Sequence, residues 1–537
     1  MIDRSSAAMG LAIVLGANAL YLAGSARVLD PMLTMDPFYI DMAGRPLVTI
    51  LTQDPSWGPL YALWLKPFVA VFHDPITVYL ANVYAMSIAV SVLLFAAVFV
   101  ASGRTWVAIG AALFFLISDV NLPLDSRVNS FALVPLLSGL TVAALLPPRS
   151  VRTAACAAGS LLAAWARPEL CVAAVGVLLA AIWRGRRRHP AWLAIGLLVV
   201  ALMALWFGRS NGRLFLAFQI AFGWNWLRWH HGWRDVFSIW QQEFGAAQSV
   251  FGALIANPAA VAHHVADNAL GTLGFLAGGA GGHRPVFPAV WRAAARLENL
   301  LASIAMLAIL VAVGARRVWR RRVLDQHGDA LLLSGAVAGA SIAAAVVVFP
   351  SPRYLAIPAV LIILNAALAI AALGPALPPL SRPGRALAAL GCLMAVPRPF
   401  VLPSDYVGGG APFQGQIAVT RKVTDTLQFI RALHLPPPVS VLTDTDGVGE
   451  MLGDGFVEVK LWQKGAQPLE AFMREHDVGM IVNLEGGRES FAAADPYWAR
   501  IQVDPDEGGF TRVTVPEHER VGVYVRKDLL HPSDARR

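Results

Sequence analysis

The sequence predicts a polytopic α-helical membrane protein with a small soluble α/β domain at its C-terminal end. Of the 537 residues, 56% are hydrophobic and only 15% are charged, against about 25% charged in a typical soluble protein. The apolar residues are gathered in blocks near the ~20 residues that a helix needs to cross a bilayer. Residues 403–537, in contrast, have the mixed composition of a soluble domain.

The apolar blocks predict about eleven membrane-spanning helices, because each is close to the required length and is separated from the next by turn residues or charges. Together they define a transmembrane domain over residues 1–402, which two long loops interrupt at 30–75 and 208–298. The blocks lie near residues 7–29, 76–101, 105–118, 131–146, 153–166, 169–183, 190–207, 299–315, 329–349, 354–373 and 385–402.

Short basic clusters between the blocks predict the orientation. If the spans alternate, these clusters all fall on one side, which the positive-inside rule makes cytoplasmic. Because the basic residues are gathered in this way, the net charge of +8 does not indicate nucleic-acid binding. The clusters are Arg104, Arg149 with Arg152, the run 184–188, the run 316–322, and Arg382 with Arg385.

With the N-terminus in the cytoplasm, both long loops and the domain 403–537 face the outside. The Ala- and Arg-rich composition is typical of bacteria, so we expect the inner membrane and a periplasmic C-terminal domain. Within the first loop, the stretch 60–72 is short and interrupted, which predicts an amphipathic helix in the interface. The second loop, 208–298, is rich in Trp and His and is expected to lie on the membrane surface.

The C-terminal region shows the pattern of a small α/β domain. Residues 439–442 predict a buried strand, 468–475 a helix and 478–482 a second strand, and alternation over 520–525 fits a further strand. The run Gly447-Val-Gly-Glu-Met-Leu-Gly453 has the wrong spacing for a dinucleotide-binding turn. We expect a tight strand-to-helix turn there instead.

Carboxylates at the membrane surface are the most informative candidates for chemistry. Asp36 and Asp41 follow the first span by a few residues. A helix that begins near Pro37 and is capped by Asp36 would present Asp36 at its start and Asp41 about one turn later. Two interpretations follow: a helix cap beside a solvated acid, or a general base held at the hydrocarbon boundary.

Three other polar motifs have structural interpretations. The adjacent pairs His230-His231 and His263-His264 are poor metal chelates, because neighbouring side chains point apart. We expect interfacial or hydrogen-bonded histidines. Arg167-Pro-Glu169, between the fifth and sixth spans, predicts either an ion pair that closes a tight loop or a substrate contact.

The first outer loop also carries a resemblance to a known family. Met35-Asp-Pro-Phe-Tyr-Ile-Asp-Met-Ala43, followed by Asp54-Pro-Ser-Trp-Gly-Pro-Leu-Tyr61, resembles the first outer loop of the GT-C fold membrane glycosyltransferases. The similarity is to the polyprenyl-phosphate-sugar-dependent enzymes of the protein mannosyltransferase and aminoarabinose transferase type. It extends to the whole architecture of many spans, large outer loops and a soluble outer domain.

This resemblance implies a set of site residues. Asp36 takes the catalytic acidic position, with Asp41 as a neighbour that tunes it or shares a metal. In the loop after the third span, Asp125 is the better match for a second acidic residue, and Asp119 is the alternative. Arg353 and Tyr354 match an Arg-Tyr pair that would bind the donor phosphate, although snorkelling to lipid headgroups is the alternative for Arg353. The remaining substrate-binding candidates are Tyr39, Asp54, Trp57 and Tyr61.

The family often has a pair of adjacent acids where this sequence has Asp36-Pro37. No cofactor is therefore certain, and a divalent metal ion is the one candidate. A helix cap or a polar loop position remains the alternative for Asp125.

The resemblance implies transfer of a sugar from a polyprenyl-phosphate donor to a glycan, lipid or protein hydroxyl outside the membrane, with Asp36 as the general base. A membrane transporter or lipid-linked glycan flippase is the main alternative, and a non-catalytic scaffold is a third. Transporters place ionisable residues at the bilayer midplane. Here the acids lie at the outer boundary, which favours surface chemistry.

Overall fold

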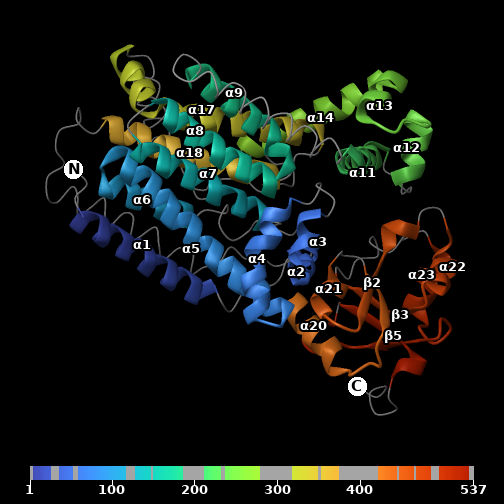
Figure 1. The fold of residues 1–537 in the computed structure, drawn as a ribbon. Helices are drawn as coiled ribbons and strands as arrows, with labels where there is room; N and C mark the ends of the chain where they lie inside the picture. Colours follow the sequence, from blue (N-terminus) through green and yellow to red (C-terminus); the bar gives the residue numbers. More distant parts are fainter. Residues whose placement is uncertain are drawn as a thin grey trace, which may run out of the picture.

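The computed structural model has two parts, a helical bundle and a C-terminal α/β domain (Figure 1). The predicted spans 190–207, 299–315 and 385–402 lie outside the described residues, as does the predicted domain boundary after residue 402. The structure describes residues 4–25, 36–52, 58–116, 127–146, 149–185, 211–230, 236–277, 317–348, 352–373, 421–443, 447–464, 467–484, 495–519 and 521–530.

Long apolar helices form the bundle, and each matches a predicted span. They are α1 (Arg4–Ser25), α5 (Pro75–Ser102), α6 (Thr105–Leu116), α7 (Arg127–Leu145), α8 (Arg149–Ala166), α9 (Cys171–Gly185), α17 (Arg317–Val347) and α18 (Pro352–Leu373). Within the described ranges, three stretches are long and apolar enough to cross a membrane: Ser5–Ala23, Pro75–Ser102 and His327–Val347. Shorter apolar helices accompany them, and the total of about eleven spans stays a prediction.

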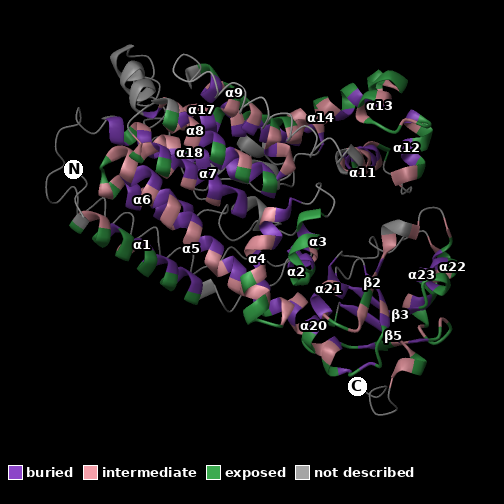
Figure 2. Ribbon diagram, in the orientation of Figure 1, coloured by how far each residue is buried: buried purple, intermediate pink, exposed green. Residues whose placement is uncertain are grey.

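Helix α1 shows how the bundle is adapted to lipid. Its exposed face is apolar, with Leu15 and Leu20 exposed to 42% and 60%, while Val14 and Asn18 on the other face are buried (Figure 2). Such a surface is unfavourable in water and expected against lipid. The buried Asn18 amide donates to the Ser91 hydroxyl of α5 at 2.8 Å, so this polar group is paired inside the bundle.

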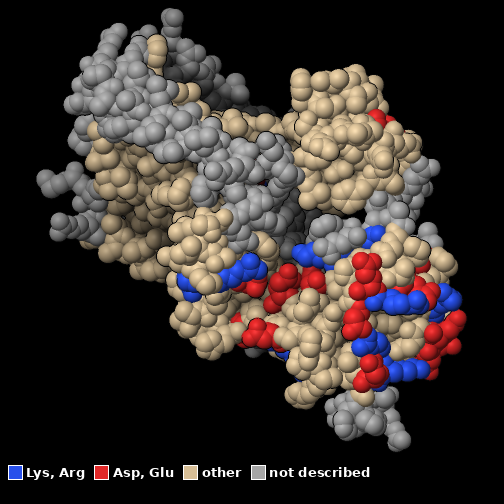
Figure 3. All heavy atoms as spheres, turned by 45° about the vertical axis from the view of Figure 1, so that its right-hand side comes forward, with Lys and Arg blue, Asp and Glu red and all other residues tan. Residues whose placement is uncertain are grey.

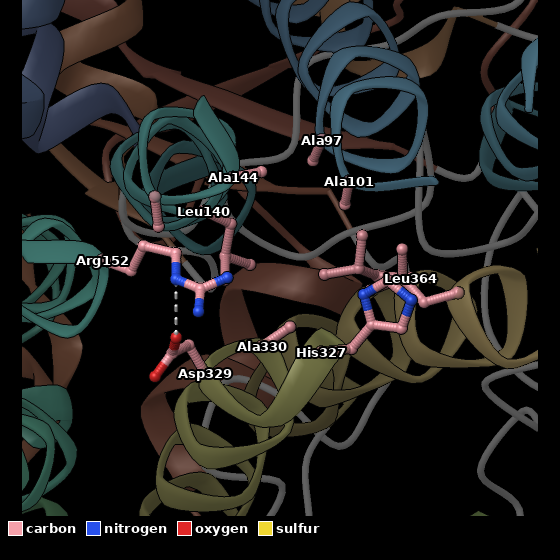
Figure 4. Close-up of a pocket in the computed structure, with 11 residues that line it drawn as sticks. Ala97, Ala101, Leu140, Ala144, Arg152, His327, Asp329, Ala330 and Leu364 are labelled. Atoms are coloured by element: carbon pink, nitrogen blue, oxygen red, sulfur yellow. Dashed lines mark ion pairs between the residues drawn. The ribbon is translucent and has the colours of Figure 1, made fainter. Parts of the chain in front are cut away.

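Arg104 and Arg152, two of the basic residues that predicted the topology, lie at one end of the bundle. Arg104 is in the turn between α5 and α6. Arg152, in the first turn of α8, lies beside Asp329 of α17, with 3.7 Å between Nε and Oδ2. A small pocket at this end is lined by both residues, by His327 and by Ala101 near the end of α5 (Figure 4). We call this the basic end.

The opposite end carries the first residues of α5, α7 and α18, and we call it the loop end. Late residues of α5 and α7 line the pocket at the basic end, so both helices begin at the other end. Helix α17 begins at the basic end, and α18 follows it directly along the chain. Because Leu364 and Leu368 of α18 also line that pocket, α18 runs toward the basic end from a start at the loop end.

The first loop forms three helices, α2 (Asp36–Gly44), α3 (Leu47–Thr52) and α4 (Pro59–Val71). Helix α4 corresponds to the predicted interfacial helix, but its inner face packs against protein: Tyr61 and Leu65 are 0% exposed, and α4 contacts α2, α5 and α8. Lys66 does not interrupt this helix. Its ammonium group donates to the carbonyl oxygens of Ala43 and Arg45, at 3.2 and 2.8 Å, which satisfies the end of α2.

The second loop forms helices that the sequence analysis did not predict: α11 (Asn211–His230), α12 (Val236–Phe244), α13 (Val250–Ala256) and α14 (Pro258–Ala277). His264 is buried between them. The Asn225 amide donates to its Nδ1 at 2.9 Å, and its Nε2 lies 3.1 Å from the carbonyl oxygen of Val347 in α17. Burial lowers the pKa of His264 to about 4, so the ring is neutral at physiological pH.

The other described histidines of this loop stack on tryptophans. His230 lies 3.9 Å from the Trp226 ring and His263 lies 4.0 Å from the Trp229 ring, between centroids. His230 Nδ1 also lies 2.9 Å from the carbonyl oxygen of Trp226. The prediction of hydrogen-bonded histidines is therefore confirmed for His230 and His264, and an interfacial position of His263 stays a prediction. Arg167 and Glu169 likewise form an ion pair in the turn before α9, which is the structural alternative for that motif.

The C-terminal domain has a five-stranded sheet in the order β2-β1-β3-β5-β4. Strands β2, β1 and β3 pair in parallel, and β5 pairs antiparallel with both β3 and β4. Every residue of β3 is buried, as expected for a central strand. The predicted strands and helix are confirmed. The elements are α20 (Lys422–Ala432), β1 (Val439–Thr443), α21 (Val448–Leu452), β2 (Phe456–Lys460), α22 (Leu469–Glu475), β3 (Val478–Asn483), α23 (Pro496–Val503), β4 (Phe510–Val513) and β5 (Gly522–Arg526).

This domain docks on the loop end of the bundle (Figure 1). Helix α21 packs against α2 and α5, and Arg431 of α20 pairs with Asp74 at the start of α5, with 2.7 Å between Nη1 and Oδ1. The first-loop helices, the start of α18 and the C-terminal domain therefore share one end of the molecule.

Candidate functional site

Asp36 is the first residue of α2 and is only 1% exposed. Its Oδ1 accepts a hydrogen bond from the Tyr61 hydroxyl at 3.0 Å. Burial opposes a negative charge on Asp36, and two features favour it: the donated hydrogen bond and its place at a helix N-terminus, where the backbone dipole is positive. The predicted helix near Pro37 is confirmed, and Asp36 lies inside the protein rather than at an open helix mouth.

The hydrogen bond from Tyr61 is the last link of a chain. The indole N–H of Trp64 donates to Asn82 Oδ1 at 2.8 Å, and the Asn82 amide donates to the Tyr61 hydroxyl at 2.7 Å. Each donor points along the chain toward Asp36, which can only accept when ionised. Hydrogen bonds aligned in one direction polarise one another, so this chain is suited to hold a carboxylate in its charged form.

Aromatic rings fix the chain in position. Tyr39 packs edge-on against Tyr61, with 5.0 Å between ring centroids, and Phe131 of α7 lies 5.5 Å from both Tyr61 and Trp64. Tyr39 and Tyr61 are 2% and 0% exposed. These two candidate substrate-binding residues therefore lie in the packed wall behind Asp36, where they support it.

The structure does not bring Asp41 to Asp36. Asp41 is about half exposed and forms an ion pair with Arg45 at 2.6 Å. Five residues along a helix correspond to a rotation of about 140°, which separates the two carboxylates on the surface of α2. Asp41 lines a different space, the cavity between the first loop and the C-terminal domain.

The other predicted site residues are described in part or not at all. Asp54, Trp57 and Asp125 lie outside the described residues. Arg353 and Tyr354 belong to the first turn of α18, at the loop end, and only their backbone is described. Across the described side chains, no three His, Cys, Asp or Glu residues are grouped so that they could hold a metal ion.

A cavity of about 510 Å³ lies where α2 and the turn between α4 and α5 meet α21 and β2. Acidic side chains gather at this junction (Figure 3). The titratable residues that line the cavity are Asp41, His73, Glu450, Asp454 and Glu458. The sequence analysis missed Glu450 and Glu458, because in the sequence they are ordinary polar positions of a small α/β domain.

Glu458 has an unusual environment for a carboxyl group. Its pKa is raised to about 8, mainly by burial and also by the hydrogen bond and negative charge of Glu450. The backbone N–H groups of Gly447 and Gly449 donate to it at 2.9 Å and act in the opposite direction. Only 4% of the Glu458 side chain is exposed, which is why burial has the largest effect.

This raised pKa predicts a fold whose stability decreases as the pH rises. In the unfolded chain the carboxyl titrates near 4.5, so between 4.5 and about 8 the folded protein binds the additional proton. The stabilisation is complete below pH 4.5 and is lost as the pH rises through about 8. We expect the unfolding temperature of the full chain in detergent to fall over this range, and Glu458→Gln to flatten the dependence.

The control is Glu507→Gln, which changes a carboxylate with 56% of its side chain exposed and should keep the wild-type slope. Other groups facing Glu458, namely Glu450, Asp41, His73, Asp454 and Lys460, whose Nζ is 3.9 Å away, are present in both variants. The difference between the two curves therefore isolates Glu458. Equal slopes for both variants would contradict the assignment.

No protein family model matches the chain, and no curated protein matches it. Among the solved structures that resemble it are two membrane enzymes. The archaeal oligosaccharyltransferase AglB from Archaeoglobus fulgidus, in complex with an inhibitory peptide and a dolichol-phosphate, is 13% identical with a TM-score of 0.37, over 88% of this chain and 69% of that chain. ArnT from Cupriavidus metallidurans in the apo state is 15% identical with a TM-score of 0.34, over 98% and 100%.

Both neighbours are GT-C fold membrane glycosyltransferases, the class that the first-loop motif resembles. Both TM-scores are below 0.5, so these likenesses assign no function to this chain.

Proposed function

We propose that the chain is an integral membrane glycosyltransferase of the GT-C class. It transfers a sugar from a polyprenyl-phosphate-linked donor to a hydroxyl group of a glycan, lipid or protein acceptor. The reaction takes place at the loop end, which faces the periplasm of a bacterial inner membrane, and Asp36 is the general base.

The observation that carries this proposal is the hydrogen-bond chain that ends on Asp36. A general base must be ionised, fixed in place and near its substrate. The chain from Trp64 through Asn82 and Tyr61 favours the ionised form and fixes it. Asp36 also lies at an end of an apolar bundle, where the lipid tail of a donor in the bilayer can approach.

The proposed reaction is a single displacement. The acceptor oxygen bonds to the anomeric carbon of the sugar while Asp36 takes the hydroxyl proton. The bond from that carbon to the phosphate oxygen breaks, and its electron pair leaves with the polyprenyl phosphate. Arg353, in the first turn of α18, pairs with the phosphate, for which a guanidinium group has the suitable bidentate geometry. One displacement at this carbon inverts its configuration.

A transporter or lipid-linked glycan flippase with a non-catalytic outer domain is the competing function. Such proteins place ionisable residues near the bilayer midplane. Near the middle of α1 and α5, the described buried polar residues are neutral: Asn18, Ser87 and Ser91. Ionisable residues such as Arg152 lie at the basic end instead, which favours chemistry at a surface over passage through the bundle.

Sugar transfer and transport can be distinguished in one experiment. The purified full chain is reconstituted into lipid vesicles with a polyprenyl-phosphate sugar labelled in the sugar, and a total cell-envelope fraction is added as the acceptor source. The proposal expects labelled product and an equal amount of released polyprenyl phosphate. Intact labelled donor that crosses the bilayer, with no release of polyprenyl phosphate, would establish the transport function instead.

A further inference from the structure

Gly447 brings the C-terminal domain against the first turn of the helix that carries Asp36. Gly447 precedes α21 and has a φ of 102°, in the left-handed region that favours glycine. A Cβ atom at this position would lie 2.7 Å from Cγ of Pro37. This distance is shorter than the closest approach of two non-bonded carbon atoms. The outer domain therefore reaches Pro37 only because residue 447 has no side chain.

Pro37 is the residue after Asp36, within the first turn of α2. Its ring fixes φ near −65°, so Pro37 has little freedom to move independently of Asp36. Pressure on the ring is therefore transmitted to the backbone that carries the Asp36 side chain. We propose that α21 of the C-terminal domain is a positioning element for Asp36, and that Gly447 and Glu458 are the residues through which it acts.

Glu458 holds the Gly447 turn in place. Its carboxyl oxygens accept hydrogen bonds from the backbone N–H groups of Gly447 and Gly449, all at 2.9 Å. These bonds connect the start of α21 to β2 and so to the sheet. The sheet thus fixes Gly447 through Glu458 on one side, and Pro37 packs against Gly447 on the other side.

The other end of α21 is fixed to the membrane domain by Arg431. Its guanidinium group donates to the carbonyl oxygens of Met451 and Leu452, at 2.6 and 3.1 Å, and to Asp74 Oδ1 at 2.7 Å. Asp74 caps α5, since its Oδ2 accepts from the Thr77 backbone N–H at 2.9 Å. One guanidinium group therefore connects the end of α21 to the start of α5.

These contacts connect α21 to two of the helices that carry the Asp36 hydrogen-bond chain. Helix α5, which Arg431 joins to α21, also carries Asn82, two turns after Asp74. Helix α21 thus touches α2 beside Asp36 at its start and is tied to the helix of Asn82 at its end. A rigid α21 keeps the distance between Asp36 and its donors constant, and this inference rests on the proposed role of Asp36 as the base.

The test compares two glycine-to-alanine variants of the full chain. Gly447→Ala introduces a methyl group against Pro37. Gly509→Ala is the matched control, because Gly509 belongs to the same domain and also has a positive φ, 77°, but has no atom within 4 Å of its potential Cβ. Both variants strain the backbone, and only the first displaces Pro37.

For Gly447→Ala we expect kcat for sugar transfer to fall about 10-fold or more, because a displacement of about 1 Å is costly in an active site. The KM for the donor should stay close to that of Gly509→Ala. The double variant Pro37→Ala with Gly447→Ala removes Cγ, the nearest atom, and leaves the contact of 3.0 Å to Cβ, so it should recover part of the activity. A purely structural contact would instead lower the unfolding temperature of Gly447→Ala without a selective loss of kcat.

Hydrogen exchange gives a readout that does not depend on activity. Backbone amides of residues 38–44 should exchange faster in Gly447→Ala than in Gly509→Ala or the wild-type chain. If transfer depends on Asp36 but the two variants have equal kcat and equal exchange, the positioning role is wrong and the proposed function stands. If no transfer is found, faster exchange limited to Gly447→Ala still supports the mechanical coupling, and unchanged exchange overturns it.

Discussion

Asp36→Asn is expected to lower kcat for sugar transfer by about 10²- to 10⁴-fold, the usual contribution of a general base. Asparagine has the same shape, and its carbonyl oxygen can still accept the hydrogen bond that Tyr61 donates at 3.0 Å. The amide cannot take up a proton, so the chemical step is lost while the packing is retained. Turnover is measured with saturating polyprenyl-phosphate sugar, and donor binding and the unfolding temperature are measured on the same preparation.

Two comparison variants make this result specific. Asp506→Asn changes an exposed acid on the C-terminal domain, paired with Lys527 at 3.0 Å, and should leave kcat unchanged. Asp41→Asn removes an exposed ion pair with Arg45, and we expect a much smaller loss than for Asp36→Asn. Equal losses at positions 36 and 41 would contradict the assignment of the base to Asp36.

The parts of the fold that local sequence determines were predicted. An apolar block of sufficient length has few alternatives to a helix in lipid, so α1, α5 and α18 lie where the sequence placed them. The positions of Arg104 and Arg152 at one end follow from the positive-inside pattern. Strand β3 was predicted because an apolar run of this length is typical of a buried parallel strand.

Of the candidate site, the sequence predicted only those residues that both belong to the first-loop motif. Asp36 and Tyr61 stand in the two halves of the first-loop motif, and the structure joins them by a hydrogen bond. Asn82 was missed because it lies within a long apolar block, where nothing in the sequence shows which helix face meets α4. Asp41 was grouped with Asp36 because the two are close in sequence, although helical geometry turns them apart.

The contacts between the two domains could not be predicted for a related reason. Arg431 and Asp74 are separated by 357 residues, and either could have been an ordinary surface charge. Gly447 was predicted to be part of a tight turn, which the positive φ confirms. Its approach to Pro37 depends on how the whole C-terminal domain is placed, and no local pattern contains that information.

Arg353→Ala is expected to weaken binding of the polyprenyl-phosphate sugar by about 10- to 100-fold, which corresponds to roughly 1.5–3 kcal/mol for a charge-assisted hydrogen bond. Helix α18 begins at the loop end, with Arg353 in its first turn, whereas Arg104 and Arg152 lie at the basic end. On the proposed function, this cation at the outer boundary would pair with the phosphate of the donor.

The matched control for this variant is Arg104→Ala, an exposed arginine at the basic end of the same bundle. It should leave donor affinity unchanged, because only a cation at the loop end can reach the donor phosphate. Arg353→Lys keeps the charge and loses the planar fork, so its donor affinity should lie between those of wild type and Arg353→Ala. A higher acceptor KM with intact donor affinity would instead assign Arg353 to the acceptor. A different cation would then have to bind the leaving phosphate.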